Sequence, residues 1–136
     1  MCTRAYNASM AKDHETEVKF KVDRFEPVRD ALAAAGAIFG GTMLLTDHYY
    51  DTPDRQLLAN DSGVRIRTQL VLDAGGPSRE TRPQLTYKGP GTGDHRTKIR
   101  REVQTRVDDE DVLAEVFGHF GLEVTLSIQK RRSTYR

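Results

Sequence analysis

The stretch "HETEVKFKV", His14 to Val22, decides the fold of this 136-residue chain. Side chains of a β-strand point alternately to its two faces. One face of this predicted strand is charged and carries Glu15, Glu17, Lys19 and Lys21. The opposite face carries Thr16, Val18, Phe20 and Val22. The stretch therefore predicts a half-buried strand with acids and bases in single file.

Three further segments have a charged or polar face of the same kind. "GVRIRTQ" alternates Arg65 and Arg67 with apolar residues, and "QLTYKG" places Lys88 on the face opposite Tyr87. "KIRREVQT" places Lys98, Arg100, Glu102 and Gln104 on one face. A polar face that meets water is common for a single antiparallel strand. Because the residue types are sorted by strand, we favour an inward-facing cationic cradle for phosphate oxygens.

The two glutamates of the first strand need their own explanation, because carboxylates repel a polyphosphate. Glu15 and Glu17 are about 6–7 Å apart along a strand. They could share or flank a Mg²⁺ or Mn²⁺ ion that also takes phosphate oxygens. The opening stretch therefore predicts a divalent cation between protein and ligand.

The order of predicted elements is strand, helix, four strands, helix, strand. The predicted strands cover residues 14–22, 42–51, 63–72, 83–89, 96–107 and the segment from 122, and the helices cover 24–36 and 108–121. Residues 73–82 contain two glycines and a proline and are expected to be weakly ordered. "GPGTGD", residues 89–94, is expected to make a turn after Lys88. Short connections favour a mainly antiparallel sheet with helices packed outside, an α+β fold.

Composition sets the outer limits. Lys and Arg number 21 and Asp and Glu number 20, so the net charge gives no argument for a nucleic-acid or membrane partner. Cys2 is the single cysteine, and no apolar run suits a signal peptide or a membrane span. We expect a cytoplasmic protein with one domain at residues 13–136, preceded by a loose extension at 1–12.

The motifs, taken together in chain order, resemble a known family. "ETEVK" is similar to the ExExK signature of the CYTH domains, the triphosphate tunnel metalloenzymes. It is followed by "DHYYDTP", "GVRIR", "LTYKGPG", "RREVQ" and "IQKRRSTY", which together extend over nearly all of the chain from Glu15. "KGPG" and the pattern IxKxRxxY resemble most closely the class IV adenylyl cyclase branch.

The resemblance implies an antiparallel β-barrel that forms a tunnel for a triphosphate, with Mg²⁺ or Mn²⁺ as cofactor. Glu15 and Glu17 would bind metal, and Glu102 matches an acidic tunnel position. Phosphate contacts would come from Lys19, Arg65, Arg67, Lys88, Lys130 and Arg132. Strand parity adds Arg100 to this set. In the phosphohydrolase branch, Lys19 would assist the attack of water on the γ-phosphorus.

The chain departs from the family pattern at its end. Lys130 and Arg132 share parity with Val124, Leu126 and Ile128, so the last strand needs either a bulge or a change of surroundings along its length. Family members continue past the position of Arg136 with further strands and acidic ligands. We therefore expect a truncated domain that is incomplete at the C-terminal end, with an open edge that a homodimer could cover. Slow turnover relative to an extended chain is expected on the same ground.

Four functions remain open at this point. The chain could convert ATP to cyclic AMP and pyrophosphate, act as a triphosphatase on an inorganic or organic triphosphate, or bind a nucleotide or polyphosphate without turnover. An RNA-binding sheet is the fourth. Tyr87 counts against it, because a base-stacking aromatic should share a face with the basic residues. The expected partner is a triphosphate small molecule such as ATP.

Overall fold

The structure is a computed structural model that describes residues 14–72, 79–93 and 97–136. Its strands are β1 (His14–Val18), β2 (Phe39–Asp51), β3 (Gly63–Leu72), β4 (Arg79–Gly93), β5 (Thr97–Arg106) and β6 (Glu123–Tyr135). Its helices are α1 (Glu26–Ala34), α2 (Gln56–Ala59) and α3 (Glu110–His119). The predicted element order is confirmed, with α2 as an addition. The predicted extension at residues 1–12 lies outside the described residues.

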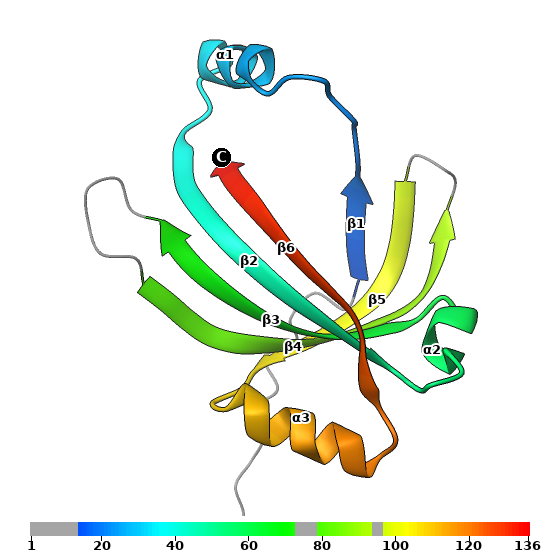
Figure 1. The fold of residues 1–136 in the computed structure, drawn as a ribbon. Helices are drawn as coiled ribbons and strands as arrows, with labels where there is room; N and C mark the ends of the chain where they lie inside the picture. Colours follow the sequence, from blue (N-terminus) through cyan, green and yellow to red (C-terminus); the bar gives the residue numbers. More distant parts are fainter. Residues whose placement is uncertain (1–13, 73–78, 94–96) are drawn as a thin grey trace, which may run out of the picture.

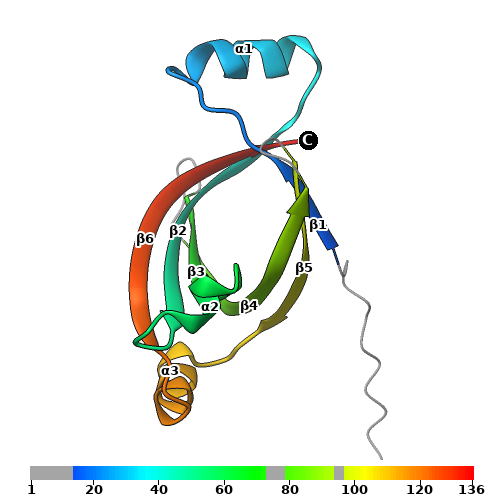
Figure 2. The same cartoon turned by 90° about the vertical axis from the view of Figure 1, so that its right-hand side faces the viewer.

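All six strands form one antiparallel sheet in the order β1-β5-β4-β3-β2-β6 (Figure 1). The sheet curls into a trough, with β6 at one edge and β1 at the other (Figure 2). Along the described strands these two edges are not paired with each other, so the sheet is not closed. The predicted α+β, mainly antiparallel, tunnel-like architecture is therefore confirmed in an open form.

The most deeply buried side chains include polar as well as apolar groups. Leu45 and Ile66 are 1% exposed, while Thr86 and Asp47 are fully buried. Arg65, Arg67 and Asp51 are also buried. Isolated buried charges are costly, so these groups must be paired with one another or hydrogen-bonded. The interior of the trough is consequently polar, as the charged strand faces predicted.

The two longer helices have the ends that their sequences predict. Gly36, with φ +79°, follows α1, and the N–H of Ala37 donates to the carbonyl of Leu32 at 2.9 Å, a Schellman C-cap. Asp109 caps α3 by accepting from the backbone N–H groups of Asp111 and Val112. The helices lie outside the trough at its opposite ends (Figure 1). None of these helices is long and apolar enough to cross a membrane, as judged over the described part of the chain.

The first strand is shorter than predicted. β1 ends at Val18, which pairs with Thr97, the first residue of β5 as the structure describes it. The prediction of a strand through Val22 was wrong, and Phe20, expected on a buried face, is 85% exposed. Lys19 follows directly after the strand end.

The strand β4 is longer than predicted at both ends. Residues 79–81 pair with β3, so the expected weak order of 73–82 was wrong for its last part, and 73–78 lie outside the described residues. The predicted turn after Lys88 was also wrong. β4 continues through Gly93 with a register shift between Lys88 and Gly91, where the N–H of Gly91 donates to Oδ2 of Asp61 at 2.8 Å.

A bulge explains one part of the unusual parity of β6. Tyr49 pairs with Leu126 and Tyr50 pairs with Val124, so Thr125 is the extra residue. Residues after the bulge keep a regular register with β2 as far as Gly41. On the other side of the bulge, Val124 pairs with Tyr50 of β2. The ring of Tyr50 packs edge-on against Phe117 of α3, with ring centroids 5.0 Å apart. The bulge changes the parity of Val124 alone. Leu126 and Ile128 follow it and still share a face with Lys130 and Arg132, and Leu126 lines the same cavity as these two basic residues.

Candidate functional site

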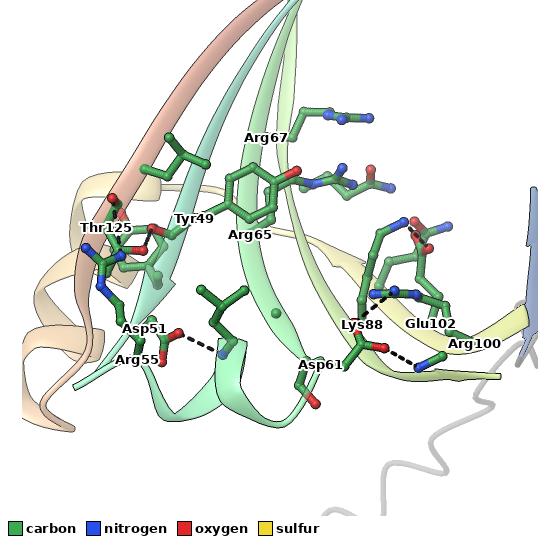
Figure 3. Close-up of a pocket in the computed structure, with 18 of the residues that line it drawn as sticks. Tyr49, Asp51, Arg55, Asp61, Arg65, Arg67, Lys88, Arg100, Glu102 and Thr125 are labelled. Carbon is green, nitrogen blue, oxygen red and sulfur yellow. Dashed lines mark hydrogen bonds and ion pairs between the residues drawn. The ribbon is translucent and has the colours of Figure 1, made fainter. Parts of the chain in front are cut away.

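A cavity of about 1470 Å³ occupies the concave side of the trough. Its lining includes every basic residue that the sequence predicted for phosphate contacts: Lys19, Arg65, Arg67, Lys88, Arg100, Lys130 and Arg132. Glu102 lines it as well. Figure 3 shows Arg65 and Arg67 on β3, with Lys88, Arg100 and Glu102 grouped on the neighbouring strands. Strand parity thus gathers side chains from separate elements into one cationic surface.

A buried carboxylate that the sequence analysis did not single out lies behind three of these cations. Asp47 of β2 is fully buried, and its Oδ1 and Oδ2 accept from Nε and Nη2 of Arg67 at 2.5 and 2.8 Å. The Nζ of Lys130 lies 3.0 Å from Oδ2, and the Nη1 of Arg65 lies 3.9 Å from the same oxygen. We call these four residues the Asp47 cluster.

The cluster holds Asp47 in its ionised form. Burial alone would raise the pKa of Asp47. Hydrogen bonds from Arg67 and Lys130, together with the positive charges of Arg67 and Arg65, instead lower this pKa from 3.8 to about 2. Arg65 makes a further contact, since its Nη2 donates to the hydroxyl of Thr86 at 3.2 Å. Because all of these groups are buried or half-buried, the cluster is a fixed floor beneath the cavity.

A second group of charges lies across the cavity on β4 and β5. Nζ of Lys88 is 2.8 Å from Oε2 of Glu102, its cross-strand neighbour. Nη2 of Arg100 is 3.5 Å from Oδ1 of Asp61. Asp61 also accepts from Gly91 at the β4 bulge, so one carboxylate joins the start of β3 to the wall formed by β4 and β5. Figure 3 shows these residues side by side.

The lining also contains uncharged side chains. Tyr49, Leu58 and Leu126 contribute aromatic and aliphatic surface there. Arg55 donates from Nη1 to the carbonyl of Thr125 at 3.4 Å, beside the β6 bulge. The cavity therefore has a cationic portion and a portion that can contact an organic group.

The short helix α2 is held in place by Asp51. This carboxylate accepts from the backbone N–H groups of Thr52, Leu57 and Leu58 at 2.7 to 3.0 Å. Burial would raise the pKa of Asp51, but these backbone donors outweigh it and lower the value. The cap explains how a four-residue helix without a buried residue of its own is fixed at the cavity rim.

The predicted metal ligands are only partly placed. Backbone pairing sets Glu15 opposite Arg100 and Glu17 opposite Lys98, while the side chains of both glutamates lie outside what the structure describes. Glu102 contributes its carboxylate to the cavity. Among the described residues no group of three or more His, Cys, Asp or Glu side chains could hold a metal ion. A metal site here would need the two glutamates of β1.

Comparison with known proteins agrees with this geometry. The sequence profile of the CYTH domain matches residues 13–136. The chain belongs to the CYTH domain family. A protein of Methanocaldococcus jannaschii with the name "Putative adenylate cyclase" is 27% identical over 122 residues, which are 90% of this chain and 63% of that protein. The CYTH chain thus spans less than two thirds of this relative.

Two solved structures share the CYTH architecture. A protein of Pyrococcus horikoshii has a TM-score of 0.70 at 26% identity, over 90% of this chain and 64% of its own. A protein of Vibrio parahaemolyticus with the name "putative adenylate cyclase" has a TM-score of 0.66 at 20% identity, over 90% of this chain and 62% of its own. At that identity the second structure supports the fold alone.

Proposed function

We propose that this CYTH chain binds the triphosphate group of an organic triphosphate in its concave cavity and supports phosphoryl chemistry of the class IV adenylyl cyclase type, from ATP to cyclic AMP and pyrophosphate. One observation carries the proposal: the seven predicted basic side chains, which come from β3, β4, β5, β6 and the residue after β1, all line one cavity. Charge-assisted hydrogen bonds from arginine and lysine are the usual means of holding phosphate oxygens. The name of the M. jannaschii relative supports the cyclase type.

The chain's own residues would position the substrate and neutralise its charge. Lys88 and Arg100 form one wall and the Asp47 cluster forms the floor, so a polyphosphate between them meets donors on two sides. In cyclisation the ribose 3′-hydroxyl gives up its proton to water as its oxygen forms a bond to the α-phosphorus, and the bond from the α-phosphorus to the bridging oxygen breaks as pyrophosphate leaves with the electron pair. Fixed donors around the developing charge are the main protein contribution to such a step.

The mixed lining favours an organic triphosphate over an inorganic one. Ligand sites combine apolar surface with a few placed polar groups, and here Tyr49 and Leu126 adjoin the cationic portion. An inorganic triphosphate would use the basic side chains alone. We therefore propose that the base, or another organic group of the triphosphate ligand, lies beside Tyr49.

The CYTH superfamily is generally metal-dependent, and the carboxylates available fit a hard divalent cation. We propose Glu15, Glu17 and Glu102 as the residues that would hold Mg²⁺ or Mn²⁺. When bound, the ion supplies charge neutralisation between these carboxylates and phosphate oxygens. Lys19, at the end of β1 and in the cavity lining, is proposed to assist catalysis.

The metal proposal gives a direct prediction for Glu17→Gln. The variant should weaken the Mg²⁺- or Mn²⁺-dependent part of triphosphate binding about tenfold, because it removes a charged metal ligand and keeps the side-chain shape. The metal-free part should not weaken, because the carboxylate removed would repel the polyanion. Calorimetric titration with tripolyphosphate, with each ion and with EDTA, separates the two parts. Equal metal dependence in variant and parent would remove Glu17 from the metal site.

The reaction type is tested by product identification. The chain is incubated with ATP, tripolyphosphate or thiamine triphosphate, each with Mg²⁺ or Mn²⁺, and every product is identified by chromatography and mass spectrometry. The proposal expects cyclic AMP and pyrophosphate from ATP, with loss in Lys19→Ala. Release of inorganic phosphate instead would make the chain a triphosphatase. Tight binding of all three compounds without product would make it a binding module.

A further inference from the structure

We propose that Asp47 is a positioning residue for the triphosphate, acting through Arg67 and Lys130. The inference rests on the proposed function for its ligand, but the contacts that carry it exist without ligand. Asp47 is fully buried and receives two hydrogen bonds from Arg67 and an ion pair from Lys130. It is thus the common anchor of basic side chains that come from two different strands.

Convergent cations repel one another when no anion lies between them. Arg65, Arg67 and Lys130 approach one another in the trough floor, where water screens little because two of the three are buried. Asp47 compensates this repulsion in the ligand-free chain and keeps the cations close together. A triphosphate then meets donors that are already placed, so less side-chain ordering opposes its binding.

The geometry also limits how Arg67 can contact a ligand. Its Nε and Nη2 are both engaged by Asp47, so that edge of the guanidinium faces the protein. The two N–H groups of Nη1 and the second N–H of Nη2 point away from this edge and are the donors proposed for phosphate oxygens. The same edge stays on Asp47 when the triphosphate is bound, because the ligand approaches from the cavity and Asp47 lies beneath it.

The sign of one mutational effect separates positioning from simple charge. Asp47→Asn removes a negative charge beside a site for a polyanion, so charge alone predicts tighter tripolyphosphate binding. Positioning predicts at least tenfold weaker binding, because Arg67 and Lys130 lose the ion that fixes them. Asp109→Asn is the matched control. It makes the same chemical change at the N-cap of α3, where Asn caps as well as Asp, and should leave the affinity within twofold.

A spectroscopic readout on the unmutated chain makes the test independent of the variant's folding and of the proposed function. In a ¹H–¹⁵N spectrum without ligand, the Nε–H of Arg67, assigned by its loss in Arg67→Lys, should be protected from exchange. It should stay so after saturation with tripolyphosphate. Fast exchange of this proton in the ligand-free chain would overturn the inference, as would tripolyphosphate binding by Asp47→Asn that equals or exceeds that of the parent. If the parent chain fails to bind tripolyphosphate while the proton is protected, the proposed function fails and the anchoring of Arg67 stands.

Discussion

Replacing Asp47 by alanine is expected to lower the free energy of unfolding by about 3–5 kcal/mol, the usual cost of removing one partner from a buried ion pair. The reason is that Arg67 and its neighbours remain buried without the carboxylate that they contact. Urea unfolding followed by circular dichroism at neutral pH measures the change. An equal loss for Asp109→Ala, which removes only an exposed cap, would show that Asp47 has no special role in stability.

The same carboxylate predicts a pH dependence with a definite sign. The pKa of Asp47 is about 2 in the folded chain and about 3.8 when the chain is unfolded. A depressed folded value contributes stability that is present above about pH 4 and is lost as the pH falls toward 2. The contribution is roughly 2–3 kcal/mol at neutral pH, since one pKa unit corresponds to about 1.4 kcal/mol. The stability difference between the parent and Asp47→Asn should therefore shrink between pH 4 and pH 2, and parallel curves would contradict this.

Removing Arg67 is expected to cost about 1.5–3 kcal/mol of triphosphate affinity, the scale of a hydrogen bond to a charged group. Arg67 lines the cavity and is fixed by Asp47, so alanine removes both the phosphate donor and the main partner of the carboxylate. Calorimetry at a temperature where the variant is folded measures the loss. Arg101→Ala is the matched control, because Arg101 is exposed and neighbours the cavity-lining Arg100 on the same strand. Undiminished affinity in Arg67→Ala would remove this arginine from the site.

Much of the fold was accessible from the sequence because strand parity is a local property. The two-residue period of "GVRIRTQ" and "KIRREVQT" predicted which side chains share a face. The cavity is lined from those faces by Arg65, Arg67, Arg100, Glu102 and Gln104. Pro27 and Gly36 likewise marked the first helix, whose C-cap the structure contains. The ends of strands were less accessible. β1 ends at Val18, which pairs with the first residue of β5, Thr97, and this register joins residues about 80 positions apart.

The residues that the sequence analysis missed depend on tertiary contacts. Asp47 lies within "LLTDHYYD", where an acid on the same strand face as Leu45 and Tyr49 was the available signal, but its role appears only when β2 pairs with β3 and β6. The helix α2 is too short to show a period, and it is fixed by Asp51 from outside its own sequence. Asp61 reaches the β4 bulge through a turn, which no periodicity predicts.

Whether the concave face of this sheet binds a triphosphate can be measured by calorimetric titration of the chain with tripolyphosphate. Alanine variants of two adjacent arginines of β6 are compared in the same experiment. Arg132 lines the cavity, while its neighbour Arg131 belongs to the opposite face of the strand. We expect a micromolar dissociation constant for the parent, which is a binding free energy of about 8 kcal/mol in magnitude. Binding should be roughly tenfold weaker in Arg132→Ala and unchanged in Arg131→Ala. Failure of the parent to bind at millimolar tripolyphosphate, or an equal loss in the two variants, would contradict triphosphate binding on the concave face.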